Sequence, residues 1–271
     1  MTLPGIPRFD AEPAARELGL VYDGPCPGGQ VGAAYVRGPD GRRSVLTTGP
    51  DVRELLEPAR AAGVPVPRYE LVRPPLIVQQ LLPGSTPRAL SPATIRSMVE
   101  TNRRCRGILA TRHDLPALAL YLRGDGPGFC LHQPLRDYDR RTRRLLDQVE
   151  EIGAAIPETL DGDDLVHTDF HPENVLVDHP ENVLVDSSGA VTGVIDWDGA
   201  TRGDGRFDLF TLRFDLAHRA PELAALVPDS GEVTPACWAH MSLRLVDWAI
   251  RHFTADEVTA WLEVAERLRP T

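Results

Sequence analysis

The sequence predicts an α+β fold in which a small antiparallel sheet comes first and a mainly helical part follows. Short apolar runs separated by turn residues occupy residues 20–48 and 69–82, a pattern typical of antiparallel strands. Longer stretches with apolar residues at helical spacing follow residue 91, and these indicate amphipathic helices. Between the helical stretches, residues 165–198 combine apolar segments with acidic and amide side chains. We expect the chemistry of the protein there.

The N-terminal part is expected to begin with a short helix at residues 12–18. A Gly-Pro-Asp-Gly turn at residues 38–41 lies between two apolar runs, and this turn chemistry indicates a hairpin. A helix is expected over residues 51–62, where Pro58 should kink or divide it and Gly63 should end it. The strands are expected at residues 20–22, 33–37, 43–47, 69–72 and 76–82.

Helices dominate the rest of the predicted structure. Ser91 and Pro92 provide an N-cap and a first helical residue, and the helix they open should run to about Ala110. Residues 111–135 are rich in Gly and Pro and are expected to be irregular. The remaining helices are expected at residues 136–156, at residues 206–217 and, as a pair whose second member opens at Thr254, at residues 234–268.

Composition limits the classes of function. The formal net charge is −10 over 271 residues, which argues against general nucleic-acid binding and suits a cationic small-molecule partner. No apolar stretch approaches the roughly 18 residues of a membrane-spanning helix, and the N-terminus lacks the apolar core of a signal peptide. We therefore expect a cytoplasmic protein with no membrane partner. The four cysteines are scattered without a CxxC pair, so reduced thiols are expected instead of a zinc site.

The central stretch carries the parts that phosphoryl transfer from ATP requires. His167, Asp169 and Asn174 form an H-x-D-x-x-x-x-N arrangement, and Asp196 closes the apolar segment that follows. Phosphoryl transfer needs a residue that orients the acceptor hydroxyl and side-chain oxygens that hold Mg²⁺ on the phosphates. An Asp, an Asn five residues later and a second Asp supply those groups, with the Asp-to-Asn spacing of kinase catalytic loops.

These residues resemble the aminoglycoside phosphotransferase-like family, which also contains choline and homoserine kinases. The resemblance rests on three blocks in order: residues 165–174 (LVHTDFHPEN), residues 193–198 (GVIDWD) and residues 203–209 (GDGRFDL). It implies a bilobal protein-kinase-like fold with a nucleotide-binding lobe over residues 1–82. A helical lobe with the catalytic loop and acceptor site would occupy residues 83–271.

The resemblance also implies roles for individual residues. Asp169 would orient or accept the proton of the acceptor hydroxyl, and His167 would shape the loop through hydrogen bonds. Asn174 and Asp196 would hold Mg²⁺, and Asp208 would anchor the catalytic-loop backbone. Further residues expected to take part are Asp198 and Asp204 at the metal or at a cationic acceptor, Gly28, Gly29 and Gln30 around the phosphates, and Gln79, Gln80 and Leu81 at the adenine.

One part of the family pattern is missing. The third strand of a kinase lobe normally carries a lysine that pairs with the phosphates and with a helix glutamate, but all 29 basic residues of this chain are arginines. The matching position falls near Thr47. Arg43, or Arg42 beside it, would have to reach the phosphates in its place, and Glu54 or Glu57 would be the partner carboxylate. An arginine fork differs from an ammonium group in geometry.

A perfect tandem duplication interrupts the motif. Residues 171–178 and 179–186 both read HPENVLVD, so Asn174 and Asn182 compete for the metal role. Asn174 keeps the tight spacing to Asp169, whereas loop tips absorb insertions at little cost. We therefore expect residues 175–177 to pair with residues 192–195, with much of the second copy as an enlarged turn. The competing register pairs residues 183–185 instead.

The sequence thus predicts an enzyme that uses ATP (or GTP) and Mg²⁺ to phosphorylate a hydroxyl of a small molecule. The expected acceptor is a cationic antibiotic such as an aminoglycoside. A non-catalytic nucleotide-binding relative and a kinase of an endogenous metabolite such as choline, homoserine or a sugar are the alternatives. A metal hydrolase that uses His167, Asp169, His171 and Asp196 as zinc ligands is a further alternative.

Overall fold

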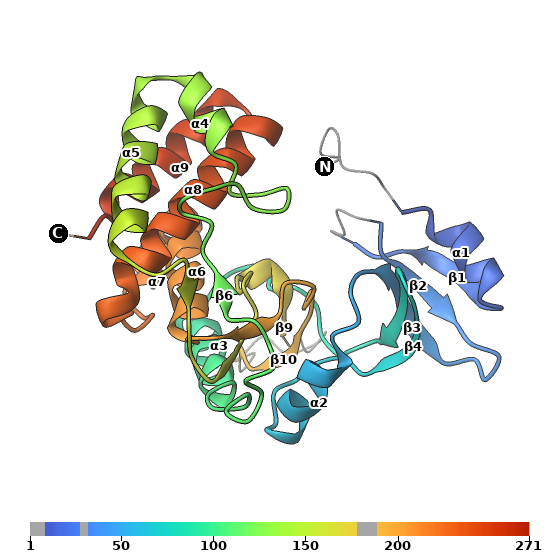
Figure 1. The fold of residues 1–271 in the computed structure, drawn as a ribbon. Helices are drawn as coiled ribbons and strands as arrows, with labels where there is room; N and C mark the ends of the chain where they lie inside the picture. The colour runs from blue at the N-terminus through green and yellow to red at the C-terminus, as the bar shows by residue number, and fades with distance from the viewer. Residues whose placement is uncertain (1–8, 28–31, 178–188, 271) are drawn as a thin grey trace.

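A computed structural model describes residues 9–27, 32–177 and 189–270 and shows an N-terminal antiparallel sheet followed by a mainly helical part (Figure 1). The sheet has the strand order β1-β2-β3-β5-β4, with every neighbouring pair antiparallel. The predicted α+β class and its order are confirmed. The strands are β1 (Val21–Pro25), β2 (Ala34–Arg37), β3 (Arg43–Thr48), β4 (Tyr69–Arg73) and β5 (Leu76–Gln80).

One face of the sheet is covered by α1 (Ala11–Glu17). Small residues of this helix pack against alternate sheet residues such as Val36 and Leu46, which are fully buried. Because successive side chains of a strand point to opposite faces, Tyr35, Val45 and Thr47 lie on the other face. The alternating pattern therefore fixes which face of β3 is covered by α1 and which face is not.

Pro58 was predicted to kink or divide the helix over residues 51–62. The helix α2 (Arg53–Ala61) contains Pro58 and continues through it, so Pro58 does not divide the helix. Gly63 ends it as predicted. Its φ is +79°, its N–H donates to Arg60 O, and the N–H of Val64 donates to Ala59 O. This pair of bonds closes the helix in a Schellman motif, whose left-handed position favours glycine.

Two helix boundaries in the C-terminal part differ from the prediction. The helix α3 (Pro92–Arg104) starts at the predicted Ser91 cap, whose hydroxyl accepts from Thr94 N, but it ends six residues before Ala110 as a run of turns begins. The predicted helix over residues 136–156 is two helices, α4 (His132–Tyr138) and α5 (Arg140–Ala155). Asp139 separates them because its extended backbone and its capping box with Thr142 start a new helix.

Short two-stranded sheets connect the helices. Their strands are β6 (Leu118–Ala119), β7 (Thr159–Leu160), β8 (Asp164–Val166), β9 (Val175–Val177), β10 (Val191–Val194) and β11 (Thr201–Gly203), paired as β6–β7, β8–β11 and β9–β10. The remaining helices are α6 (Arg206–Arg219), α7 (Pro221–Ala224), α8 (Thr234–His252) and α9 (Ala255–Arg267). They confirm the helices predicted near residues 206–217 and 234–268.

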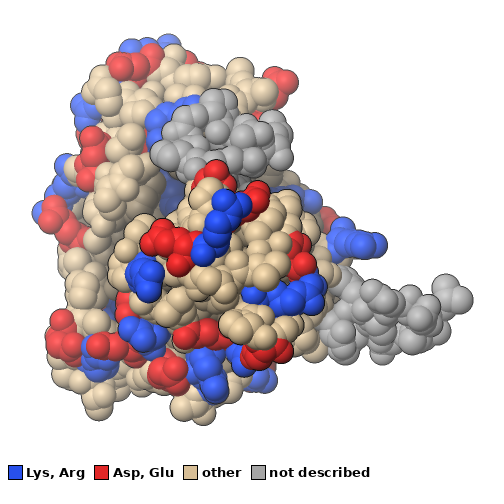
Figure 2. Space-filling view, turned by 90° about the vertical axis from the view of Figure 1, so that its right-hand side faces the viewer, with Lys and Arg blue, Asp and Glu red and all other residues tan. Residues whose placement is uncertain are grey.

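Two hydrophobic cores hold the C-terminal part together. One joins α5, α8 and α9 around buried Trp238 and Phe214, and the other surrounds β9 and β10 and includes Trp197. The described residues of the stretch 165–198 thus lie on a packed scaffold. The four cysteines are free thiols. No helix among the described residues is long and apolar enough to cross a membrane. Acidic and basic side chains are interspersed over the face shown in Figure 2.

Candidate active site

The loop that follows β8 is anchored through hydrogen bonds from its backbone N–H groups. The N–H groups of His167 and Thr168 donate to the two carboxylate oxygens of Asp208 at 2.8 and 2.9 Å. Asp208 reaches them from the first turn of α6 and is buried. Burial raises the pKa of Asp208 to about 7, although the two N–H bonds oppose that rise. Thr168 adopts a left-handed φ of 72°, a strained conformation that this anchoring stabilises.

The imidazole of His167 shapes the loop in a single tautomer. Its Nε2 donates to Ile195 O at 2.8 Å, and its Nδ1 accepts from the N–H of Asp169 at 3.3 Å. The ring packs against Trp197 at a centroid distance of 4.5 Å. Burial lowers the pKa of His167 to about 4, so the ring is neutral at physiological pH. Both ring nitrogens are engaged, which leaves this histidine unable to shuttle protons.

Asn174 and Asp169 are in direct contact. The Nδ2 of Asn174 donates to the backbone O of Asp169 at 3.0 Å and to its Oδ2 at 3.1 Å. Because the Nδ2 group lies among acceptors of Asp169 and beside Nε2 of His171, Oδ1 is the atom of Asn174 that remains to bind a cation. A 3-10 turn over Pro172–Asn174, capped by His171, gives the amide this position.

The carboxylate of Asp169 has a cationic partner that sequence reasoning missed. Arg244, on α8, donates to Asp169 Oδ1 at 2.9 Å and to Thr168 O at 2.7 Å. Burial alone would raise the pKa of Asp169, but Arg244 and His171 outweigh it and hold the pKa well below its usual range. Asp169 is therefore an ionised hydrogen-bond acceptor. The only sequence signal was an arginine between two leucines of an amphipathic helix.

The hairpin of β9 and β10 brings Asn174 and Asp196 to the same end of the site. Val175 pairs with Val194, and the N–H of Ile195 donates to Asn174 O at 3.0 Å. The predicted pairing of residues 175–177 is confirmed, and the competing register is not adopted. Asn182 and the second copy of HPENVLVD fall outside the described residues.

Asp196 and Asp198 form an acidic pair beyond β10. The side chains of both reach solvent, yet burial raises the pKa of each, and the neighbouring charges of Asp169 on Asp196 and of Asp196 on Asp198 add to the rise. Neither carboxylate has a hydrogen-bond or ion-pair partner among the residues that the structure describes. Asp196 has a left-handed φ of 65°, and the carboxylate of Asp198 lies against the backbone of Gly49.

These residues fit a Mg²⁺ ion by their chemistry. Asp196 follows the residue whose N–H donates to Asn174 O, so a carboxylate without an ion-pair partner in the described ranges and an amide side chain come from neighbouring backbone positions, and Mg²⁺ prefers such oxygen ligands together with phosphate oxygens. The zinc alternative finds no ligand set, since no group of three His, Cys, Asp or Glu side chains in the described part could hold a metal. Asp204 instead forms an ion pair with Arg206 at 2.6 Å, which lowers the net pKa of Asp204 although burial opposes the shift.

The predicted nucleotide-binding residues of the sheet are only partly described. Gly28, Gly29 and Gln30 fall outside the described residues. Arg43 pairs with Asp23 at 3.0 Å, and its guanidinium lies over the ring of Tyr35.

Glu54 and Glu57, the carboxylates predicted to pair with Arg43 or Arg42, form ion pairs with other residues. Glu54 binds Arg112 and Glu57 binds Arg60, while Arg42 binds Glu70. No pair equivalent to the kinase lysine and glutamate is present among the described residues.

The adenine-contacting residues were predicted at the end of β5. Gln79 pairs with Val45 and Tyr69 across the sheet, and the N–H of Gln80 donates to Arg68 O at 2.8 Å. Leu81 follows directly after the strand ends. Gln79 shares its sheet face with Val45, Tyr69 and the Thr47 position. The backbone at Leu81 lies beyond the sheet ladder and is available to a ligand.

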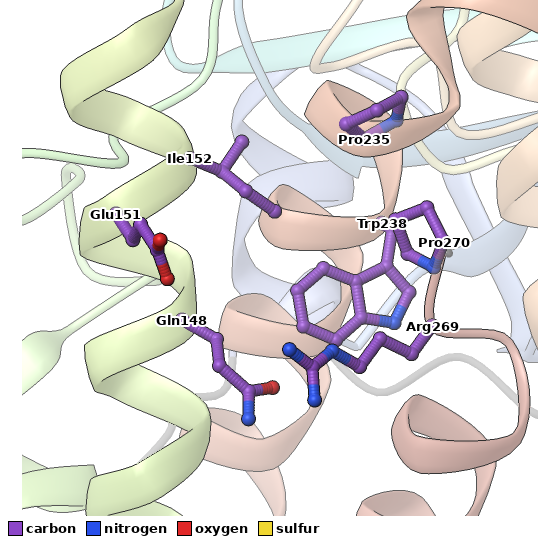
Figure 3. Close-up of a pocket in the computed structure, with 7 residues that line it drawn as sticks. All are labelled: Gln148, Glu151, Ile152, Pro235, Trp238, Arg269 and Pro270. Atoms are coloured by element: carbon purple, nitrogen blue, oxygen red, sulfur yellow. The ribbon is translucent and has the colours of Figure 1, made fainter.

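Two pockets elsewhere do not include these residues. The first, of about 190 Å³, lies between α5, the start of α8 and the C-terminal segment (Figure 3). Its indole wall, Trp238, donates to Ala265 O at 2.8 Å, so this is a seam of the helical packing. A hollow of about 500 Å³ at the start of α2 is lined by residues 51–55, Glu57 and Leu115. The second hollow includes Glu54 and Glu57, the carboxylates predicted to pair with the phosphate-binding arginine, but neither hollow includes Asp169, Asn174 or Asp196.

The sequence pattern of the phosphotransferase enzyme family matches residues 28–236, which is most of the chain. No curated protein sequence gives a match. The matched range includes the strands β2 to β5 of the sheet, residues 165–198 and α6.

Several solved structures share the fold. An amicoumacin kinase in complex with AMP-PNP, Ca²⁺ and its antibiotic is similar with a TM-score of 0.63 at 12% identity, covering 96% of this chain and 93% of that one. A thermostable mutant of the aminoglycoside phosphotransferase APH(4)-Ia, in a ternary complex with AMP-PNP and hygromycin B, has a TM-score of 0.61 at 17% identity, with 95% and 96% covered. An apo form of a thermostable mutant of the same enzyme has a TM-score of 0.58 at 18% identity, with 94% and 96% covered. At these identities the likeness concerns the fold.

Proposed function

From the premise that this chain belongs to the phosphotransferase enzyme family, we propose that it transfers the γ-phosphoryl group of ATP to a hydroxyl of a small molecule. The observation that carries the proposal is the convergence on one site of Asp169, Asn174 and Asp196, an ionised carboxylate beside two groups suited to a cation. The nucleotide would bind to residues 1–82, with GTP as an alternative donor, and the acceptor to residues 83–271.

The residues would divide the work as follows. Asp169 accepts a hydrogen bond from the hydroxyl group of the acceptor. This bond orients the hydroxyl oxygen of the acceptor toward the γ-phosphorus. A bond forms from that oxygen to phosphorus, the bond from phosphorus to the β,γ-bridging oxygen breaks, and the proton passes to Asp169. Because the pKa of Asp169 is so low, the proton moves late and orientation is its larger contribution. Asn174 and Asp196 would hold Mg²⁺, which neutralises phosphate charge when bound.

The acceptor is proposed to be a cationic antibiotic. The net charge of −10 steers cations toward the protein, and the similar structures include an aminoglycoside phosphotransferase with hygromycin B and an amicoumacin kinase. A kinase of an amino alcohol or a sugar is the second candidate. The site chemistry is the same for all of them.

A phosphorylation screen tests the proposal. ADP release from ATP and Mg²⁺ is measured across aminoglycosides (hygromycin B among them), cationic peptide antibiotics, macrolides and amino alcohols. Activity with at least one acceptor that Asp169→Asn abolishes is the expected result. ATP binding without turnover on any acceptor would overturn it in favour of a non-catalytic nucleotide-binding protein, an outcome for which the missing lysine gives a physical reason.

A further inference from the structure

Arg244 links the catalytic loop to a second loop of the helical part. Its Nη1 donates to Thr168 O at 2.7 Å and its Nη2 to Asp169 Oδ1 at 2.9 Å. The guanidinium also lies over the ring of Phe129, 5.6 Å from the centroid. Its side chain is only 22% exposed. Arg244 is thus clamped between Asp169 and the loop before α4.

The loop that carries Phe129 has a fixed backbone. Tyr121 and Cys130, near its two ends, have left-handed φ values of 54° and 55°. His132 Nε2 donates to Tyr121 O at 3.0 Å, and Arg251 donates to Gly128 O at 3.1 Å. Non-glycine residues keep such conformations only where the surroundings hold them, and they concentrate at functional sites. The ring under Arg244 therefore stands on a rigid support.

The other contacts of the Asp169 carboxylate involve Oδ2, so Arg244 is the residue that holds Oδ1. Its Oδ2 faces Asn174 at 3.1 Å and His171 at 3.4 Å, whereas its Oδ1 has Arg244 as partner. Without that contact the carboxylate could rotate about its χ2 bond, a soft torsion for aspartate. A guanidinium can bond the backbone oxygen and the carboxylate at once in one plane, which a lysine ammonium does less well.

We infer that Arg244 is a positioning residue of the phosphoryl transfer: it fixes the orientation of the Asp169 carboxylate toward the acceptor hydroxyl, and Phe129 holds the guanidinium in place. This inference rests on the proposed function. It assigns the middle of α8, around residue 244, and the loop at residues 121–130 to the acceptor side of the site.

The experiment compares Arg244→Ala and Arg244→Lys with Arg141→Ala. Arg141 makes a similar two-bond ion pair, with Glu266, but it joins α5 to α9 away from the site residues. ADP release is measured with the best acceptor of the screen and with water alone. We expect Arg244→Ala to lower kcat about 100-fold, as a displaced catalytic group does, with KM for ATP changed less than about threefold because only orientation is lost. Arg141→Ala should leave kcat unchanged.

Chemical rescue separates positioning from a general loss of structure. Guanidinium ion at tens of millimolar should restore part of kcat in Arg244→Ala and nothing in Asp169→Asn. Arg244→Lys should retain more activity than Arg244→Ala. Phe129→Leu, which leaves the ion pair but removes the ring, should lower kcat by about twofold to fivefold, the range of exposed cation–π contacts.

Each other outcome overturns the inference. An unchanged kcat in Arg244→Ala shows that Asp169 needs no partner, and a raised kcat shows that Arg244 restrains it. A loss without guanidinium rescue, accompanied by an equal loss in Arg141→Ala, reduces Arg244 to a packing role. In all three cases wild-type turnover keeps the proposed function. If wild type itself releases no ADP with any acceptor, both proposals fall together.

Discussion

Asp169 and the pair Asp196–Asp198 are acidic side chains of one site in opposite surroundings. Asp169 has Arg244, His171 and Asn174 as partners, and its pKa is held low. Asp196 and Asp198 have no ion-pair partner among the described residues. Burial raises the pKa of both, and on Asp196 it outweighs the opposing charges of His171 and Arg244.

The difference indicates two kinds of work. A carboxylate that the protein itself neutralises can orient a substrate hydroxyl without any metal bound. Two partly desolvated carboxylates without a direct ion-pair partner are costly to ionise, and a bound divalent cation reduces that cost. The protein therefore supplies the charge partner for one acid, and we propose that Mg²⁺ supplies it for the other two.

The largest effect is expected at Asp196. Asp196→Asn keeps the shape but removes a carboxylate that we propose as a metal ligand, so kcat should fall about 1000-fold, equivalent to several kcal/mol of lost charge stabilisation. ADP release at saturating ATP and Mg²⁺ measures it. Asp204→Asn, which breaks the ion pair with Arg206, is the matched control and should stay within about threefold of wild type. Loss of less than tenfold in Asp196→Asn would remove Asp196 from the metal site.

A substitution of Asp208 tests whether its hydrogen bonds to the loop backbone keep Asp169 in position. In Asp208→Asn one of the two loop N–H groups, that of His167 or Thr168, loses its acceptor because an amide has a single oxygen. A buried unsatisfied donor costs about 1–3 kcal/mol, and the displaced loop should lower kcat about 100-fold. Urea unfolding and kcat are both measured. An unchanged kcat alongside lost stability would show that the anchor serves folding alone.

The loop at residues 167–174 and the β9–β10 hairpin could be predicted from the sequence because their geometry depends on residues close together in the chain. The distance from Asp169 to Asn174 is five residues, and a tight turn leaves few ways to place them. Pairing of Val175 with Val194 followed from that choice. Arg244 was missed because it meets Asp169 across 75 residues of sequence, and side chains at such separation carry no periodic signal.

The break at Asp139 shows a second limit. The apolar stripe of residues 136–156 continues through it, so periodicity predicted one helix. The capping box of Asp139 with Thr142 competes with helix continuation, and spacing alone does not tell which wins. The sequence also did not predict the contact at Gly49, because this glycine makes room for the carboxylate of Asp198, which comes from a distant part of the chain.

The pH dependence of Mg²⁺ binding sharpens the comparison. Asp198 has a folded pKa raised from 3.8 to about 7, so below pH 7 a metal must displace its proton. Apparent Mg²⁺ affinity should therefore rise with pH, by up to about tenfold per pH unit, and level off above pH 7. Without metal, in EDTA, the pH dependence of stability has the opposite sign. The folded state binds the Asp198 proton more tightly than the unfolded state does, so the contribution of Asp198 to the free energy of unfolding falls as pH rises from about 4 to 7.

Asp198→Asn isolates that contribution. Asp196, Asp208 and Asp215 also have raised pKa values and shift stability with the same sign, so only the difference between wild type and this variant belongs to Asp198. Unfolding temperatures across pH 5–8, with and without Mg²⁺, measure it. Identical pH profiles in the two proteins would show that Asp198 does not titrate in this range.

Gly49 gives the smallest expected effect and tests how closely the sheet approaches the acidic pair. A Cβ at Gly49 would lie 2.5 Å from Asp198 Oδ1 and 2.7 Å from its Oδ2, a contact that forces the carboxylate to rotate away. Gly49→Ala should therefore weaken Mg²⁺ binding by about threefold to tenfold, less than the roughly 10–100-fold effect of removing a group that supports a metal ligand, because the carboxylate is turned and not removed. Gly41→Ala adds a methyl group where nothing lies within 4 Å; its left-handed φ strains the alanine, but Mg²⁺ affinity should not change. If Gly49→Ala binds Mg²⁺ as tightly as wild type while Asp198→Asn does not, the carboxylate has room to bind from another rotamer, and the end of β3 does not set its position.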